Sequence, residues 1–137
     1  MPLWIQLGVH WHGYAILGPG PIDPRTGRRR RLRSRPGALL RTPAAAAAWV
    51  HGAARVWGGT GLDRWDPDTH RWPRVCPDLR AADINRTVTA MLLDGTSAYL
   101  RAHRVGHPLD IALEAPTAMD CPRPGCPPHR PSPPIPP

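Results

Sequence analysis

Apolar residues recur at every second position near the start of the chain, between residues 9 and 17. The apolar set is Val9, Trp11, Ala15 and Leu17, and the set that alternates with it is His10, His12 and Tyr14. A period of two is typical of a β-strand with one face on a core. Residues 3–7 alternate in the same way and predict either the beginning of this strand or a separate one.

The stretch after this strand has the composition of a hairpin connection. Residues 23–27 read Asp-Pro-Arg-Thr-Gly. In such a turn Asp bonds the local backbone, Pro presets φ, and Gly takes the left-handed position. Residues 28–35 then form a second, arginine-rich arm. The sequence therefore predicts a β-hairpin over residues 10–35, which opens an antiparallel sheet of two or three strands.

A helix is predicted over residues 43–57. Thr42 is the expected N-cap, and Pro43 suits the first helical position. The alanines at 44–48 favour helix, and Gly58 with Gly59 supplies the stop.

Residues 78–104 predict a second helical region. Their apolar side chains recur at helical spacing, and Asp78 or Asp83 is the expected N-cap. Asp94 and Gly95 are expected to divide this region into two helices.

Three weaker signals complete the chain. Residues 62–75 predict a hairpin-like loop around a turn at 66–69, and residues 109–113 alternate as a short strand that adds to the opening sheet. From residue 116 onward ten of 22 residues are Pro, which predicts a disordered, polyproline-rich tail that tethers or contacts a protein partner.

These elements predict one small α+β domain over residues 1–115 and a tail over 116–137. Within the domain, a two- or three-stranded antiparallel sheet is expected to pack on two main helices.

The charge of the chain favours anionic partners. Its net charge is +8, and all 18 of its Lys and Arg residues are Arg. The densest cluster is the second arm of the expected hairpin, with Arg28, Arg29, Arg30, Arg31, Arg33 and Arg35. Guanidinium groups this close repel one another, so a polyanion is the expected partner and these six residues are the expected contacts. Coding by GC-rich DNA also produces an excess of Arg over Lys, and this second origin stays open.

Residues 4–57 resemble the arm-type DNA-binding domain at the N-terminus of tyrosine recombinases from phages and integrative elements. The matching features are the turn, the basic arm and the alanine-rich helix over residues 23–55. The resemblance implies a three-stranded sheet on one helix, with the sheet in the major groove and the arginines of 28–35 on phosphates and base edges. Leu40-Arg41 stands where an aromatic residue usually precedes the Thr. A catalytic recombinase domain has no room in this chain.

The expected function is therefore non-enzymatic DNA binding, as an accessory factor of a mobile element or phage in a GC-rich bacterium. An alternative is a structural or interaction protein, such as a small virion or assembly component that contacts acidic protein surfaces. No Ser/His/Asp, P-loop or paired-carboxylate motif points to an enzyme.

A second alternative comes from His10-Trp11-His12, which has the His-hydrophobic-His form of rolling-circle replication initiators. Imidazoles at i and i+2 of a strand point to the same side and suit a divalent metal. By that resemblance the chain is a metal-dependent DNA nickase, and Tyr99 is its nucleophile, placed on a helix.

No cofactor or metal is expected, and zinc is the alternative that the sequence leaves open. Cys121, Cys126 and His129 offer three zinc-capable ligands close together. A fourth ligand is expected from Cys76, His103 or His107.

The three cysteines are too few for a disulfide scaffold, so a reducing cytoplasm is the expected compartment. The first residues lack a basic region followed by a long apolar run, and no stretch approaches the about 20 apolar residues of a membrane span. The protein is expected to be soluble, not secreted, and without a membrane partner.

Overall fold

The chain folds around a six-stranded antiparallel sheet in the order β2-β1-β6-β5-β3-β4, shown by a computed structural model that describes residues 1–18, 20–117, 120–121 and 126. The strands are β1 (Trp11–Leu17), β2 (Ala38–Leu40), β3 (Gly61–Arg64), β4 (Arg74–Cys76), β5 (Ala98–His103) and β6 (Leu109–Glu114). The helical segments are α1 (Leu3–Leu7), a 3₁₀ turn η1 (Pro24–Gly27), α2 (Arg28–Arg33), α3 (Pro43–Val56) and α4 (Ala81–Leu92).

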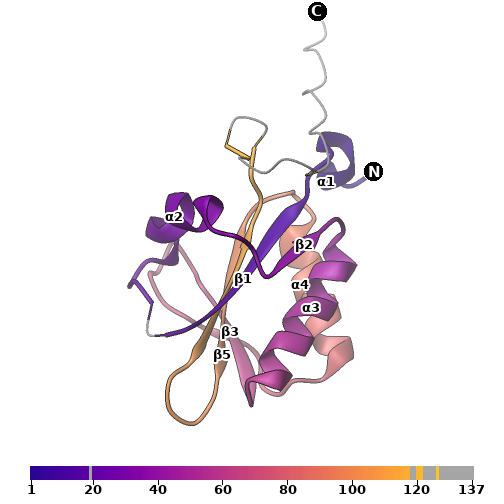
Figure 1. The fold of residues 1–137 in the computed structure, drawn as a ribbon. Coiled ribbons are helices and arrows are strands. Elements are labelled where there is room, and N and C mark those ends of the chain that lie inside the picture. The colour runs from indigo at the N-terminus through magenta and orange to yellow at the C-terminus, as the bar shows by residue number, and fades with distance from the viewer. Residues whose placement is uncertain (19, 118–119, 122–125, 127–137) are drawn as a thin grey trace, which may run out of the picture.

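The two faces of the sheet are covered by different elements. Helices α3 and α4 lie side by side on one face, and α2 lies on the opposite side (Figure 1). The face under α3 and α4 is apolar, with Trp11, Leu62, Leu100, Leu109, Ile111 and Leu113 all at most 1% exposed. The other face, called here the polar face, carries the alternate residues, including His12, Tyr14, Tyr99 and Glu114.

Helix α3 begins and ends where its sequence signals place it. The Thr42 hydroxyl accepts a hydrogen bond from the Ala45 backbone N–H at 3.0 Å, and Pro43 occupies the first turn. Gly58 follows the helix with φ +73°, a conformation that glycine adopts without strain. The predicted helix over residues 43–57 is confirmed.

The mixed α+β class is confirmed, but the sheet is larger than the two or three strands expected. The expected pair of main helices is not matched either, because the described chain also contains α1, α2 and η1. The extra strands come from the hairpin at residues 62–75, which forms as β3 and β4, and from β5.

The predicted hairpin over residues 10–35 is wrong. Strand β1 pairs with β2 and with β6, and the arginine-rich stretch is helix α2. The Asp23 carboxylate accepts the Arg25 backbone N–H at 2.9 Å and begins a 3₁₀ turn rather than a hairpin loop. Arginine has a good helix propensity, and the helix buries Leu32 against the protein.

Three other predictions need correction, and one is confirmed. Residues 3–7 form a helix, not a strand, and residues 98–103 form β5, not a second helix. Neither Asp78 nor Asp83 caps α4, whose N-cap is Arg80 with no side-chain cap. The short strand at 109–113 is confirmed as β6 and pairs with β1.

The proline-rich tail expected over 116–137 falls for the most part outside the described residues. Within the part of the chain that is described, every helix is too short or too polar to cross a membrane.

Alanine substitutions at two glycines test how closely α3 packs on the sheet. A Cβ at Gly13 of β1 would lie 2.8 Å from the Trp49 ring of α3, whereas a Cβ at Gly52 on α3 would meet nothing within 4 Å. Gly13→Ala is expected to lower the free energy of unfolding by about 1–3 kcal/mol through overpacking. Gly52→Ala is expected to raise it by about 0.5–1 kcal/mol, because alanine favours helix. Urea unfolding followed by tryptophan fluorescence measures both, and equal stabilities would contradict this packing.

Candidate metal centre and basic helix

The candidate site lies on the polar face, at the end of the sheet where β1 begins and β6 ends. His12 of β1 is the cross-strand partner of Glu114, the last residue of β6. His10 precedes β1 by one position, so both imidazoles project to the same side of the extended chain. The segment that follows β6 returns to this point and carries Cys121 and Cys126.

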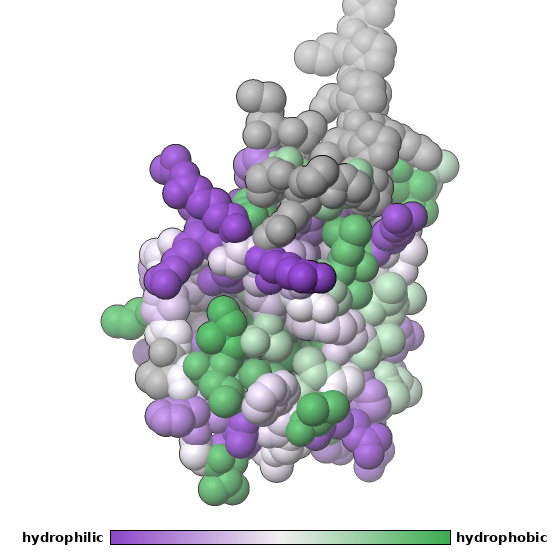
Figure 2. All heavy atoms as spheres, in the orientation of Figure 1, coloured by the Kyte–Doolittle hydropathy of each residue, from purple (hydrophilic) through white to green (hydrophobic). Residues whose placement is uncertain are grey.

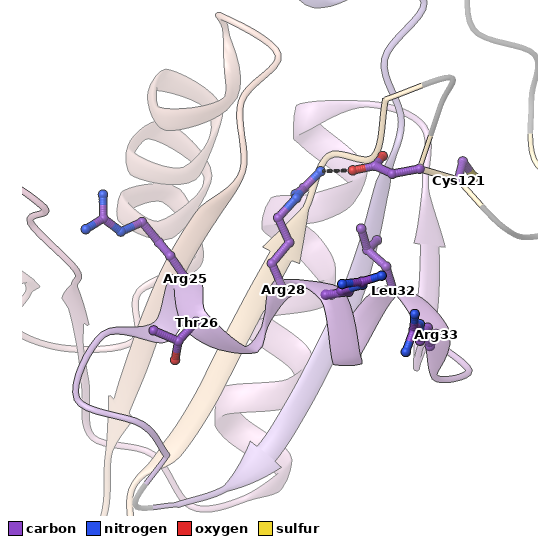
Figure 3. Close-up of a pocket in the computed structure, with 8 residues that line it drawn as sticks. Arg25, Thr26, Arg28, Leu32, Arg33 and Cys121 are labelled. Atoms are coloured by element: carbon purple, nitrogen blue, oxygen red, sulfur yellow. Dashed lines mark hydrogen bonds and ion pairs between the residues drawn. The ribbon is translucent and has the colours of Figure 1, made fainter.

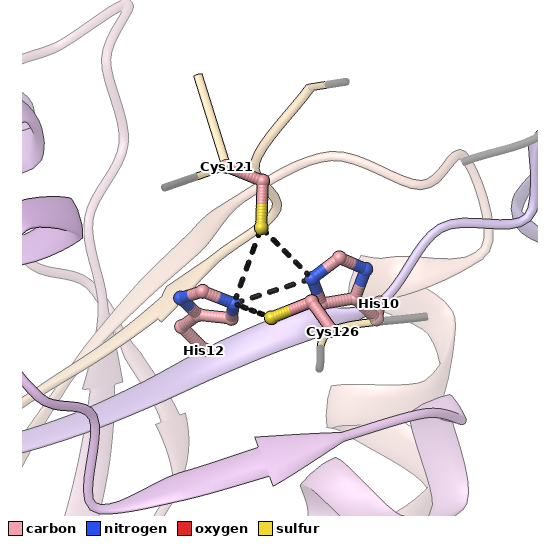
Figure 4. A group of neighbouring side chains, drawn as sticks. All are labelled: His10, His12, Cys121 and Cys126. Atoms are coloured by element: carbon pink, nitrogen blue, oxygen red, sulfur yellow. Dashed lines mark hydrogen bonds between the residues drawn. The ribbon is translucent and has the colours of Figure 1, made fainter. Parts of the chain in front are cut away.

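Four side chains converge there (Figure 4). The Nε2 atoms of His10 and His12 are 3.2 Å apart. The Cys121 Sγ lies 3.6 Å from His10 Nε2 and 3.9 Å from His12 Nε2, and the Cys126 Sγ lies 3.4 Å from His12 Nε2. All four donor atoms lie within 4.8 Å of one another.

The two histidines of the cluster are buried from solvent, and the two cysteines are half-buried. His10 is 1% exposed and His12 is 0% exposed. All four side chains can give a lone pair to a metal ion, through imidazole nitrogen or thiolate sulfur.

The fold joins two half-sites that the sequence analysis kept apart. The sequence suggests a nuclease metal for the His10–His12 pair and zinc for the cysteines, and the structure brings these residues into one cluster. Among the described residues, the expected fourth ligands Cys76, His103 and His107 are not part of this cluster. Cys76 is buried beside Thr87, and His103 contacts Asp63. His129 lies outside the described residues.

The buried carboxylate of Glu114 holds α2 against the polar face. Glu114 is 0% exposed and accepts hydrogen bonds from Arg28 Nη1 at 2.7 Å, Arg31 Nη2 at 2.8 Å and the Tyr99 hydroxyl at 3.0 Å. An ionised carboxylate is buried at low cost only when such partners surround it. The first and fourth residues of α2 supply the two guanidinium groups, because residues three apart share one helix face.

Five of the six arginines expected to bind DNA lie in α2 and are divided by the helical period, and Arg35 follows the helix. Arg28 and Arg31 face Glu114, whereas the exposed members are Arg29, Arg30, Arg33 and Arg35. Strongly hydrophilic side chains project from the molecule where Figure 1 places α2, as Figure 2 shows. This exposed set is called the α2 arginine face below.

A groove of about 660 Å³ separates α2 from the segment after β6 (Figure 3). Its lining includes Arg29 and Arg33 on one side and Cys121 on the other. Arg28 crosses it and donates to Asp120 Oδ2 at 3.0 Å. Burial of Asp120 would raise its pKa, but hydrogen bonds from Thr117 and Arg28 outweigh that effect and lower the pKa below its usual range. The cluster of His10, His12, Cys121 and Cys126 and the α2 arginine face are therefore neighbours.

Tyr99 does not have the surroundings of a nucleophile. It lies on strand β5, not on a helix, and is 8% exposed. Burial and the nearby Glu114 carboxylate raise its pKa to about 12. A tyrosine that attacks phosphate benefits from a lowered pKa, and here the pKa is shifted the other way.

Removing the charge of Glu114 is expected to destabilise the fold. Glu114→Gln removes the carboxylate that Arg28 and Arg31 share, leaving Arg28 only its pair with Asp120, and is expected to cost about 3 kcal/mol in the free energy of unfolding. Asp110→Asn is the control. Asp110 is also paired with an arginine, Arg101 of β5, but its side chain is more exposed than that of Glu114. The control substitution is expected to cost about 1 kcal/mol or less. A smaller loss for Glu114→Gln than for Asp110→Asn in urea unfolding would contradict the role assigned to Glu114.

The tyrosine pKa is directly measurable, because the chain has two tyrosines and Tyr14→Phe leaves Tyr99 alone. Absorbance titration of that variant is expected to give a pKa of about 12 in place of 10.0. Well below pH 10 the hydroxyl is neutral in both folded and unfolded chains, so its contribution to stability is constant. As the pH rises toward 12 the unfolded chain ionises first, and the stability falls. An inflection near pH 10 in the folded variant would contradict the burial of this hydroxyl beside Glu114.

Comparison of the chain with protein-family models, with curated proteins and with solved structures found no match. The resemblance of residues 4–57 to a recombinase arm-type domain accordingly stays a prediction.

Proposed function

We propose that the protein binds nucleic acid, in particular duplex DNA, through the α2 arginine face. The observation that carries this proposal is the exposure of Arg29, Arg30, Arg33 and Arg35 on one short segment of a chain with net charge +8. Among the described residues, none of these four forms an ion pair, so their charge is available to a partner.

Self-repulsion within a strand of six arginines no longer supports this proposal. Arg28 and Arg31 are neutralised by Glu114 of the same chain, and Arg28 also by Asp120. The support comes instead from the four arginines that the fold leaves in solvent. Because Arg29 and Arg33 are four residues apart in a helix, they project from one side, and Arg30 lies next to Arg29.

The contacting element in this proposal is a helix. The major groove of B-DNA is about 12 Å wide and admits an α-helix, and arginine is suited both to phosphates and to the acceptor edge of guanine. Phosphate contacts dominate affinity, so binding with little dependence on sequence is the first expectation. No step of catalysis is proposed.

The test is a salt titration of binding to a duplex DNA fragment. Replacing Arg29, Arg30, Arg33 and Arg35 by Ala removes about four phosphate contacts. The slope of log K against log salt is expected to become shallower by about 3–4. At low salt the affinity is expected to fall by at least about tenfold, since each contact contributes to counterion release.

A matched control removes the same charge from elsewhere. Arg41, Arg55, Arg64 and Arg71 are exposed and lie outside α2, so their quadruple Ala variant lowers the net charge equally. This control variant is expected to keep most of the slope of log K against log salt. Equal losses in the two variants would mean that net charge alone attracts the DNA and would overturn the assignment to α2.

The interaction-protein alternative is an outcome of the same experiment. Polyglutamate serves as an acidic-polypeptide probe under the same salt conditions. Binding of polyglutamate without binding of any DNA fragment at low salt would overturn the nucleic-acid proposal and favour an acidic protein partner.

A further inference from the structure

We propose that His10, His12, Cys121 and Cys126 bind one Zn²⁺ ion, which fastens the segment after β6 to the start of β1. The inference is independent of nucleic-acid binding. It rests on the convergence of these four donors, which come from chain segments 111 residues apart.

The identity of the four donor atoms indicates which metal ion they would bind. Two imidazole nitrogens and two sulfurs in a compact group are typical of tetrahedral zinc, whereas Mg²⁺ and Ca²⁺ prefer oxygen ligands. No carboxylate belongs to the cluster. Among common biological cations, Zn²⁺ is therefore the best match.

Four of the six distances between donor atoms are close to those of a tetrahedral zinc site. With Zn–N near 2.0–2.1 Å and Zn–S near 2.3 Å, tetrahedral angles place two nitrogens about 3.3 Å apart and a nitrogen and a sulfur about 3.5 Å apart. The structure has 3.2 Å between the imidazole nitrogens and 3.4, 3.6 and 3.9 Å between nitrogen and sulfur. The other two pairs lie within 4.8 Å, so the donors can share one central ion after the sulfurs move inward.

Hydrogen bonding alone is a poorer explanation of the cluster. The Nε2 atoms of His10 and His12 both face the same point and both approach sulfur. One shared proton bonds one pair of these donors at a time, and a thiol is a weak hydrogen-bond partner. A central cation bonds all four lone pairs at once.

Charge balance also favours the ion at this buried position. Two thiolates and one Zn²⁺ sum to zero, and the imidazoles bind as neutral ligands, so no net charge is placed beside the 0% exposed His12. The site therefore adds nothing to the positive field of the α2 arginine face.

Four protein ligands indicate a structural role. Catalytic zinc sites usually keep one position open for water or substrate, and structural sites close all four. Here the ion would join strand β1 to a segment that Arg28 also holds at Ala115 and Asp120, and Ser97 at Ala115. A closed site also separates this cluster from the metal-dependent nickase chemistry that His10-Trp11-His12 suggests by itself.

Metal analysis of the full-length protein, purified without chelator, tests the proposal. About one equivalent of zinc per chain is expected. After replacement of zinc by Co²⁺, visible ligand-field bands of a tetrahedral site and near-ultraviolet thiolate-to-cobalt absorption are expected. Removal of the metal by a strong chelator is expected to lower Tm, because metal binding to the folded chain adds to stability.

Substitution of the cysteine ligands tests whether the ion binds at this site. Cys121→Ser with Cys126→Ser is expected to lose the zinc and the thiolate absorption while circular dichroism shows the fold retained, since both residues lie beyond the last strand. Cys76→Ala and His107→Ala are the matched controls and are expected to keep one equivalent. His107 is exposed, and Cys76 is outside the cluster.

Three results would overturn the proposal. The first is metal-free protein that shows no tetrahedral cobalt spectrum on titration with Co²⁺. The second is zinc that persists in the Cys121→Ser, Cys126→Ser variant. The third is a thiol assay in which these two cysteines react only after reduction, which would show a disulfide in place of the metal. Alkylation that becomes possible on chelation, without a reductant, supports the site.

Discussion

The constraint on which the structure depends is the burial of polar and ionisable side chains on the polar face of the sheet. His10, His12 and Glu114 are each at most 1% exposed, and a buried polar group is costly unless partners satisfy it. The rest of the chain brings those partners. Helix α2 supplies two guanidinium groups to Glu114, and the segment after β6 brings two cysteine sulfurs to the histidines.

This constraint explains why one run of arginines has two roles. The helical period turns Arg28 and Arg31 toward the protein, where they compensate a buried charge, and turns Arg29, Arg30 and Arg33 toward solvent. Fold stabilisation and the proposed nucleic-acid binding thus use different members of the same segment. The groove beside α2 also reaches Cys121, so the proposed metal centre lies next to the proposed binding face (Figure 3).

Local signals predicted some elements correctly, whereas the arginine-rich stretch predicted as a hairpin arm is helix α2. The Thr42-Pro43 helix start is a matter of neighbouring backbone groups, and the alternation around His10 and His12 correctly placed both imidazoles on one side of an extended chain. Residues 98–103 also alternate with period two, and that signal was available. The helical spacing of the preceding residues of α4 extends into this stretch and masks the strand signal.

The candidate site was outside the reach of such signals. Arg31 meets Glu114 across 83 residues, and Cys121 meets His10 across 111 residues. These pairs form only because the strand order β2-β1-β6 brings distant segments together, and the spacing of residues along the chain does not indicate them. The most direct measurement of the central claim is X-ray absorption at the zinc edge of the purified protein. Two sulfurs at about 2.3 Å and two nitrogens at about 2.0–2.1 Å are expected. A first shell made only of nitrogen and oxygen would contradict the His10–His12–Cys121–Cys126 site.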